Sequence, residues 1–428
     1  MTIRVIGLGI DPVALPTPYA DIIAGADVLV GGKRQLAQSA HLVKRPVRTI
    51  PIAAPLHTVF AAVADEVDTG HGVVVLADGD PLFFGIGARL VAEFGPEAVR
   101  VYPNVTAMQT AAARIGVPWQ GIPVVSLHGR DDYAPLRHAL YEHNLVAVLT
   151  DDRNTPGTIS RFLLERGADW FAMHVFESLG APEERVTRHS LSEAASREFS
   201  SLNLILLERT GVPERQLALG TEETAYETDN GLITKWPVRA AGIAALQLTP
   251  DSVLWDLGAG CGSVGLEACA IVRRGTVYAV ERDAARVEMI RKNRRRFGAL
   301  SLEVVHGTLP DCLAGLPDPD RVFIGGGLGK NADLLDVVLP RLEAVSARDE
   351  QQAATGRAGR LVVHCVLLGT LERVRSRLEK AGWRYDITML QASVSGPLGG
   401  DVRLEARNPV FIVAASPCMT TTTGTGRR

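Results

Sequence analysis

Cysteine is scarce in this sequence, and no two cysteines stand at a metal-binding or redox spacing. Five cysteines are scattered over 428 residues, and none forms a C-x-x-C pair. An odd, scattered set does not suit a disulfide framework or a cysteine-based metal site. We therefore expect reduced thiols, most of them small buried side chains, and no metal centre.

Long apolar runs and a strong net charge are missing as well. No run approaches the roughly 18 apolar residues of a membrane-spanning helix, and the first residues lead into an expected strand rather than a signal peptide. The net charge is only −3, whereas a general nucleic-acid surface is usually basic. We expect a cytoplasmic protein whose partners include neither a membrane nor a nucleic acid, although a local basic pocket is compatible with this charge.

What the sequence does contain is a regular alternation of short apolar runs and longer helical patterns. Glycine, proline and aspartate bound the runs, and strand–helix alternation of this kind is typical of parallel α/β architecture. The expected strands are 4–8, 28–30, 72–77, 99–102, 124–127, 145–149, 203–207, 253–257, 276–280, 302–305, 321–324, 360–365 and 410–413.

The chain is longer than one hydrophobic core usually serves, so we expect more than one domain. A turn-rich and then acidic stretch separates two series of expected strands. We place a first domain at 1–210, a linker at 211–230 and a second domain at 231–415. Residues 346–359 are expected to form a mobile loop, and 416–428, with four consecutive threonines, a disordered tail.

The second domain opens with a glycine motif that follows an expected strand and begins a helix. Gly258, Gly260 and Gly262 have the spacing G-x-G-x-G, and Asp256 stands two residues before the first glycine. Glycines allow a sharp turn and the close approach of a ligand. Glu281, at the tip of the next strand, is placed to accept hydrogen bonds from both ribose hydroxyls of a nucleoside cofactor.

This spacing favours S-adenosylmethionine (SAM) over a dinucleotide, whose fingerprint is G-x-G-x-x-G. A structural turn without a ligand is the remaining alternative. Thr308, after the third strand, stands where this fold usually contacts adenine. Glycines at 325–327 and 329 follow the fourth strand, where methylases of exocyclic amines carry Asp/Asn-Pro-Pro-Tyr/Phe. We expect them to leave room for a bulky planar substrate.

Several segments of the second domain resemble the decarboxylating precorrin-6B C15-methyltransferases, which have a Rossmann-like class I SAM methyltransferase fold. The resemblance rests on 231–239, 254–265, 316–320 and 405–410, and only the 346–359 loop is longer than usual. It implies cofactor contacts from Thr234, Asp256, Gly258, Ala259, Gly260, Cys261, Gly262, Glu281, Arg282, Thr308 and Leu309.

The first domain carries motifs that are unspecific one by one and indicate a family only when taken together. Taken alone, Gly7 and Gly9 are equally compatible with an ordinary strand-ending turn. With 31–34, 76–85, 102–109 and 126–130 they are similar to the tetrapyrrole methylases, above all the precorrin C5-methyltransferase branch. Asp78 replaces a frequent serine, and the opening loop is short. The resemblance implies a two-lobed class III fold, with SAM contacted by Gly9, Gly79, Asp80, Pro81, Thr106 and Ala107.

Together the two resemblances imply a fusion of the precorrin-6Y C5,15-methyltransferase type, with one SAM site per domain, in cobalamin biosynthesis. The first domain would methylate precorrin-6B at C5. The second would methylate C15 and decarboxylate the C12 acetate, giving precorrin-8. An electron-rich ring carbon needs positioning and exclusion of water more than acid–base help. We also expect a homo-oligomer, with a tetramer as the expected size.

The carboxylates of such a substrate suit arginine and lysine. Candidate contacts are Arg130, Lys235 and Arg239, with a surface salt bridge as an equal alternative for each. His306 and His364 are candidate proton shuttles. The alternative for each is an ordinary structural role in the core. Alternatives for the whole chain are an RNA methyltransferase, which salt-sensitive RNA binding would support, a non-enzymatic SAM-binding regulator, and the loss of catalysis in one half.

Overall fold

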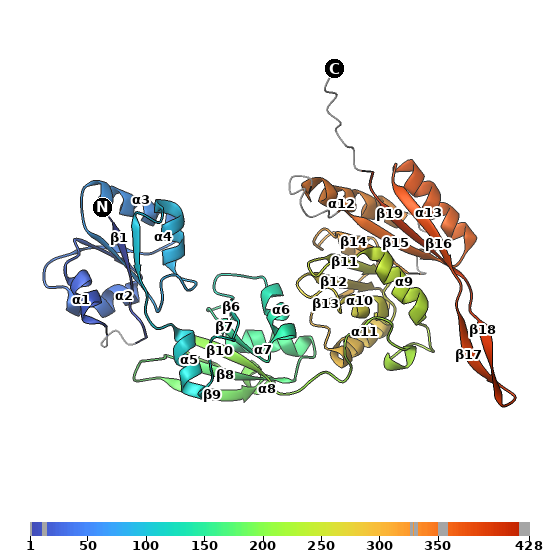
Figure 1. The fold of residues 1–428 in the computed structure, drawn as a ribbon, viewed down its shortest axis with the longest axis horizontal. Coiled ribbons are helices and arrows are strands. Elements are labelled where there is room, and N and C mark those ends of the chain that lie inside the picture. The colour runs from blue at the N-terminus through green and yellow to red at the C-terminus, as the bar shows by residue number, and fades with distance from the viewer. Residues whose placement is uncertain (1, 11–14, 326–327, 329–332, 350–357, 419–428) are drawn as a thin grey trace, which may run out of the picture. The chain divides into compact units, whose positions relative to one another are not determined.

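The computed structural model describes residues 2–10, 15–325, 328, 333–349 and 358–418. The chain divides into two compact units. One consists of residues 1–131, 143–160 and 172–208, and the other of residues 132–142, 161–171 and 209–428. Each unit contains a wholly or largely parallel sheet that helices cover (Figure 1), so the expected α/β architecture is confirmed.

The first unit begins with a five-stranded parallel sheet in the order β3-β2-β4-β1-β5. Alternate residues of its central strand enter two separate cores, with Val73 and Val75 in one and Val74 and Leu76 in the other. Both faces are therefore buried, as in most parallel sheets. The elements are β1 (Ile3–Gly7), α1 (Thr17–Ala24), β2 (Val28–Gly31), α2 (Lys33–Ser39), η2 (Ala40–Leu42), β3 (Arg48–Pro51), α3 (Leu56–Asp68), β4 (Val73–Ala77), α4 (Ile86–Phe94) and β5 (Val99–Tyr102).

A second, mixed sheet follows in the order β6-β7-β10-β8-β9. Met108 and Ala111, on the helix that leads into this sheet, pack against Ala147 and Leu206 of its strands. The elements along this stretch of the chain, of which α6 and the end of α7 are counted in the second unit, are α5 (Ala107–Ile115), β6 (Val124–Ser126), α6 (Ala134–Glu142), β7 (Leu145–Leu149), α7 (Pro156–Glu165), β8 (Phe171–Glu177), β9 (Arg185–Ser190), α8 (Leu191–Ala195) and β10 (Asn203–Arg209).

The second unit contains a seven-stranded sheet in the order β13-β12-β11-β14-β15-β19-β16. Its first five strands are parallel, and β19 runs antiparallel to both β15 and β16. The strand order reverses at β11, and ligands of open α/β sheets bind at the carboxyl ends of the strands at such a point. The strands are β11 (Val253–Leu257), β12 (Thr276–Glu281), β13 (Leu302–His306), β14 (Arg321–Ile324), β15 (Arg360–Cys365), β16 (Arg384–Leu390) and β19 (Val410–Ser416).

Helices cover both faces of this sheet. The face that carries Leu254 packs against α9, α10 and α11, and the opposite face, which carries Trp255, packs against α12 and α13 (Figure 1). A two-stranded ribbon, β17–β18, extends from the sheet (Figure 1, red). These elements are η3 (Glu223–Ala225), α9 (Trp236–Leu246), α10 (Ser263–Ala268), α11 (Ala284–Phe297), η4 (Asp311–Leu313), α12 (Asp333–Asp349), α13 (Leu368–Lys380), β17 (Ser393–Leu398) and β18 (Asp401–Ala406).

All strands expected from the sequence are present, and six others were not foreseen: β3, β8, β9, β16, β17 and β18. Five of these carry mostly exposed or half-exposed side chains and so lack an apolar run. The expected loop at 346–359 begins inside α12, and its residues 350–357 lie outside the described part, as do tail residues 419–428. Among the described residues no helix is long and apolar enough to cross a membrane.

Candidate cofactor sites

The glycine motif of the second unit forms the turn between β11 and α10. Gly258, Gly260 and Gly262 have φ angles of 74°, 60° and 81°, a left-handed conformation that residues with side chains disfavour. The amides of Gly258 and Ala259 donate to the carbonyl of Val280 at 2.9 and 3.0 Å. A Cβ at Gly258 or Gly260 would meet nothing within 4 Å, so the outer side of the loop leaves room for a ligand.

Glu281 ends β12 beside this loop and holds its backbone. Its Oε2 accepts a hydrogen bond from the amide of Gly260 at 2.9 Å, and its Oε1 accepts from the amides of Arg282 and Asp283 at 2.9 and 3.1 Å. A carboxylate has about four lone-pair sites. Glu281 can therefore accept hydroxyl protons from a ligand while it still holds the loop.

Asp256 lies beneath the loop rather than on its open side. It is buried, and its Oδ2 accepts a hydrogen bond from the amide of Gly265 at 2.9 Å. Burial raises the pKa of Asp256 to about 7, with the Gly265 bond opposing and the charge of Glu281 adding to the shift. Cys261, in the loop itself, is also buried. Both residues support the loop from the inside of the protein.

The turn after β13 lies beside the end of β12. The amide of Gly307 donates to the carbonyl of Glu281 at 3.1 Å. The Nε2 atom of His306 lies 3.1 Å from the carbonyl oxygen of Arg282, the residue that follows β12. Thr308 is exposed in this turn. The structure therefore brings Thr308 to the same edge of the sheet as Glu281 and the glycine loop, with Leu309 next along the chain.

Helix α9 runs antiparallel to β15. Near its end the carbonyl of Ala245 accepts a hydrogen bond from Arg360, at the start of β15. One turn earlier, Gly242 packs against His364, near the end of β15. At about 1.5 Å per residue, the first turn of α9 lies beyond the carboxyl end of β15. The start of α9 is thus at the same edge of the sheet as the glycine loop.

Polar and apolar side chains gather at this edge. Thr234 and Lys235, both half-buried, directly precede α9. Trp236 is 45% exposed, and Leu367 and Leu368, which follow β15, are 68% and 69% exposed. Three large apolar side chains are thus exposed at the edge of the sheet that also carries the glycine loop, and grouped exposed apolar side chains are typical of binding surfaces.

Arg239, predicted to contact the substrate, has a different position. Its side chain is 0% exposed. Its Nε donates to Oε1 of Glu267 at 2.8 Å, and its two other nitrogens donate to the carbonyls of Thr221 and Thr234. This prediction is corrected, because every donor group of Arg239 faces the protein interior and finds its partner there.

His364 is also an interior residue. It is buried on β15, and its ring packs edge-on against Phe323 at 4.7 Å and against Gly242, which has no side chain to obstruct it. Burial lowers the pKa of His364 to about 4. A proton shuttle needs a path to the substrate, so the prediction of substrate contact or proton transfer by His364 is corrected to a place in the core.

Three turns of the first unit meet at the carboxyl ends of β1, β4 and β5. Gly9 and Gly79 pair as a β-bridge, with φ angles of 72° and 53°. A Cβ at Gly7 would lie 2.1 Å from the carbonyl oxygen of Gly79. Asn104, after β5, donates from Nδ2 to the carbonyl of Gly7 at 3.0 Å. The approach of these turns requires glycine.

Thr106 and Asp80 lie at this meeting point and also serve local structure. Asp80 accepts a hydrogen bond at Oδ1 from the amide of Leu82 at 2.8 Å. Thr106 caps α5, which begins at Ala107, because its Oγ1 accepts from the amide of Gln109 at 3.1 Å and its own amide donates to Gln109 Oε1 at 2.9 Å. A Cβ at Gly79 would be 3.1 Å from Thr106 Cα. The Gly79–Asp80 turn and the start of α5 therefore adjoin, as expected.

The turn after β4 is held from two directions. Pro81 is buried, and a Cβ at Gly85 or Gly87 would lie 2.5 or 2.7 Å from its carbonyl oxygen. Asp78, which departs from the usual serine, forms an ion pair with Arg34 at 2.7 Å. The departure therefore links the first turn of α2 to the end of β4 by charge.

Arg130 and His128 are exposed after β6. The Nη1 of Arg130 donates to the carbonyl of Ser126 at 3.3 Å, and the Nδ1 of His128 lies 3.1 Å from the carbonyl of Thr150. Asn154 donates to the carbonyl of Arg130 at 2.9 Å. The backbone here is fixed while the Arg130 side chain stays accessible to a ligand.

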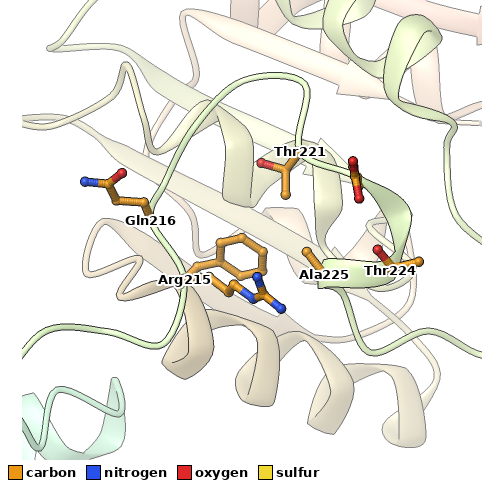
Figure 2. Close-up of a pocket in the computed structure, with 7 residues that line it drawn as sticks. Arg215, Gln216, Thr221, Thr224 and Ala225 are labelled. Atoms are coloured by element: carbon orange, nitrogen blue, oxygen red, sulfur yellow. The ribbon is translucent and has the colours of Figure 1, made fainter.

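A separate hollow of about 360 Å³ lies on the second unit between the segment before η3 and the end of α11 (Figure 2). None of its residues is among the predicted cofactor or substrate contacts. Its lining consists of Arg215, Gln216, Thr221, Glu222, Thr224, Ala225 and Phe297. In the described ranges no cluster of His, Cys, Asp or Glu is arranged to hold a metal ion.

Two family descriptions match the chain, one in each half. Residues 2–195 match the tetrapyrrole (corrin/porphyrin) methylases, and residues 224–416 match a precorrin methyltransferase domain. A decarboxylating precorrin-6Y C(5,15)-methyltransferase of Sinorhizobium is 33% identical, over 95% of this chain and 94% of its own.

Two shorter proteins of Salmonella typhimurium each match under half of the chain. A cobalt-precorrin-7 C(5)-methyltransferase is 36% identical over 48% of this chain and 98% of its own length. A decarboxylating cobalt-precorrin-6B C(15)-methyltransferase is 32% identical over 45% of this chain and 93% of its own length.

Proposed function

This chain belongs to the family of decarboxylating precorrin-6Y C5,15-methyltransferases, and on that premise we propose its reaction in detail. It methylates precorrin-6B at C5 and C15 and decarboxylates the C12 acetate, giving precorrin-8 in cobalamin biosynthesis. The likeness to the Sinorhizobium protein over 95% of the chain carries the proposal. Two separate Salmonella proteins, named for a C5 and a C15 reaction, support a division of labour between domain 1–210 and domain 231–415.

We propose one SAM site in each domain, and SAM supplies an electrophilic methyl group when bound. In the second domain Gly258 and Gly260 of the loop face open space, and Glu281 beside them offers acceptors for the ribose hydroxyls. The remaining contacts in that site come from Thr234, Arg282, Thr308 and Leu309, with Asp256 and Cys261 behind the loop. The first site takes Gly9, Gly79, Asp80, Pro81, Thr106 and Ala107.

The substrate of the second domain lies at the edge formed by the start of α9 and the end of β15. A reduced tetrapyrrole combines an apolar ring with carboxylate arms. Trp236, Leu367 and Leu368 are exposed at this edge and suit the ring, and Lys235 beside them suits a carboxylate. Arg130 has the corresponding role in the first domain.

The chain's own contribution to the chemistry is positioning. A ring carbon already rich in electrons needs no general base to become a nucleophile, so the side chains hold it in line and exclude water. In the decarboxylation the bond between the acetate methylene and the carboxylate breaks. Carbon dioxide leaves, the electron pair enters the conjugated ring, and the former acetate methylene takes up a proton from solvent to become a methyl group. Neither step asks for a buried proton shuttle, which agrees with the interior position of His364.

We further propose that the chain forms a homo-oligomer, with a tetramer as the expected size, and works in the reducing cytoplasm. The β17–β18 ribbon exposes Leu398, Val402 and Leu404, and an isolated two-stranded ribbon is marginally stable in water. All five cysteines are free thiols. Light scattering of the wild type and of Leu404→Lys measures the size, and an unchanged monomer in both contradicts the oligomer.

The decisive test is mass spectrometry of the product formed from precorrin-6B and SAM. A gain of two methyl groups with loss of one carbon dioxide supports both half-reactions. One methyl gain with the same loss leaves the second domain active and removes the proposal for the first. An unchanged precorrin with folded protein, both without and with cobalt, contradicts the proposed function.

A further inference from the structure

Glu267 connects the helix after the glycine loop to the segment before α9. It lies in α10 and is 1% exposed. Its Oε1 accepts from Nε of Arg239 at 2.8 Å, from the amide of Thr221 at 2.9 Å and from the hydroxyl of Tyr226 at 3.0 Å. Its Oε2 accepts from the amide of Gly220 at 3.0 Å. One buried carboxylate thus binds two backbone amides and two side chains.

Arg239 continues this network to the other end of the same segment. Besides its bond to Glu267, the guanidinium donates to the carbonyls of Thr221 and Thr234. It also lies over the ring of Tyr226, 5.1 Å from the ring centre. A single rigid fork therefore fixes the start and the end of segment 221–234, and Thr234 is a proposed cofactor contact.

Asn293 of α11 joins the middle of this segment to the glycine loop. It is fully buried. Its Oδ1 accepts from the amide of Glu227 at 2.8 Å, and its Nδ2 donates to the carbonyls of Glu227 and Cys261 at 2.9 and 3.0 Å. Cys261 lies within the loop, so the bond from Asn293 reaches the cofactor loop directly.

We propose that Arg239, Glu267 and Asn293 are positioning residues that hold segment 221–234 against the glycine loop and so set the affinity of the second domain for SAM. Burying an ion pair costs desolvation unless its remaining donors and acceptors are satisfied. Here those partners are mostly backbone groups of separate segments, so the network defines relative position. All three side chains are buried, so they act through the segment and the loop rather than by contact with SAM, and the proposal rests on the proposed function.

The test uses the full chain with Arg239→Lys. Lysine keeps the charge opposite Glu267 but lacks the fork that reaches both carbonyls. Hydrogen exchange of the amides in 221–234 is expected to speed up. The KM for SAM, measured from carbon dioxide release, is expected to rise about tenfold, with a much smaller change in kcat. C5 methylation in the same chain should keep its KM.

Two further variants accompany Arg239→Lys: a second test of the network and a matched control. Asn293→Ala breaks the network from the other side and should raise the same KM, which keeps the test open if Arg239→Lys fails to fold. Arg274→Lys is the matched control. The exposed Arg274 pairs with Asp251 at the opposite end of the strands, and this change should alter neither exchange nor KM.

The outcomes separate the proposal from the function on which it rests. Unchanged exchange and unchanged KM in folded Arg239→Lys and Asn293→Ala overturn the positioning role. A fall in kcat with KM unchanged also counts against it. If the wild type releases no carbon dioxide, the proposed function fails. Exchange in 221–234, compared with the Arg274→Lys control, then still decides whether the network holds the segment.

Discussion

At the scale of single residues, Glu281 combines a structural and a proposed binding role. Its carboxylate holds the amide of Gly260 in the loop, and two further amides at the end of β12. The same oxygens are the proposed acceptors for ribose hydroxyls. Loop shape and cofactor affinity therefore depend on one charge.

Glu281→Gln should weaken SAM binding in the second domain more than it lowers stability. Glutamine keeps one acceptor oxygen but loses the charge, and bonds to a charged acceptor contribute about 1.5–3 kcal/mol. We expect the KM for SAM in carbon dioxide release to rise by about tenfold or more. Glu288→Gln, on the exposed face of α11 beside Arg291, is the control. Equal KM values in the two variants would refute the role.

His364 should make the stability of the second unit depend on pH. Burial lowers its pKa from 6.5 to about 4, so between these values the unfolded state binds more protons. Stability is then lost as pH falls through that range, by at most ~3 kcal/mol. Asp256, whose pKa burial raises to about 7, acts in the opposite direction, so its effect must be removed by comparison.

The comparison is thermal unfolding of wild type and His364→Gln from pH 7 to pH 4.5. Both proteins contain Asp256, so the difference between them isolates the histidine. We expect the wild type to lose more stability on acidification than the variant. If acidification lowered the stability of both proteins equally, His364 would not be buried as described.

At the scale of elements, the loop between β11 and α10 owes its shape to backbone conformation. Gly258 has a φ of 74° but has open space around it. Gly258→Ala should therefore cost about 1–2 kcal/mol through the left-handed conformation alone, and should weaken SAM binding. Gly315→Ala, at a glycine with equal space and no positive φ, is the matched control. Equal unfolding midpoints would contradict this account of the loop.

The start of α9 tests the proposed substrate surface. Trp236 is 45% exposed at the carboxyl edge of the sheet, so its removal exposes no core. Trp236→Ala should raise the KM for precorrin several-fold while leaving the KM for SAM and the unfolding midpoint unchanged. Steady-state kinetics with each substrate varied in turn make the distinction. A change only in oligomer size would instead assign Trp236 to contacts between chains.

At the scale of the whole molecule, the two domains are expected to work independently, each with its own glycine turns. Gly79→Val should abolish C5 methylation, because Gly79 has a φ of 53° and a Cβ there would lie 3.1 Å from the backbone of Thr106. Carbon dioxide release and C15 methylation should continue. Mass spectrometry then shows one methyl gain with loss of carbon dioxide. Loss of both reactions in a folded protein would contradict independence.

Local pattern determined the architecture and the glycine loops of this protein. Buried parallel strands need continuous apolar runs, and left-handed turns need glycine, so β4, β11 and the loop at Gly258 are visible in the sequence. The exposed strands β16, β17 and β18 carry no apolar run and were not predicted.

Only the tertiary structure decided which individual polar side chains are buried and which lie at the surface. Arg239 and Lys235 stand four positions apart in one motif, yet the first is buried and the second is half-buried at the carboxyl edge of the sheet. Arg239 is interior because Glu267, Thr221 and Thr234 converge on it in space. Burial of a charge depends on such partners from separate segments, and their convergence is a property of the folded chain rather than of any local pattern.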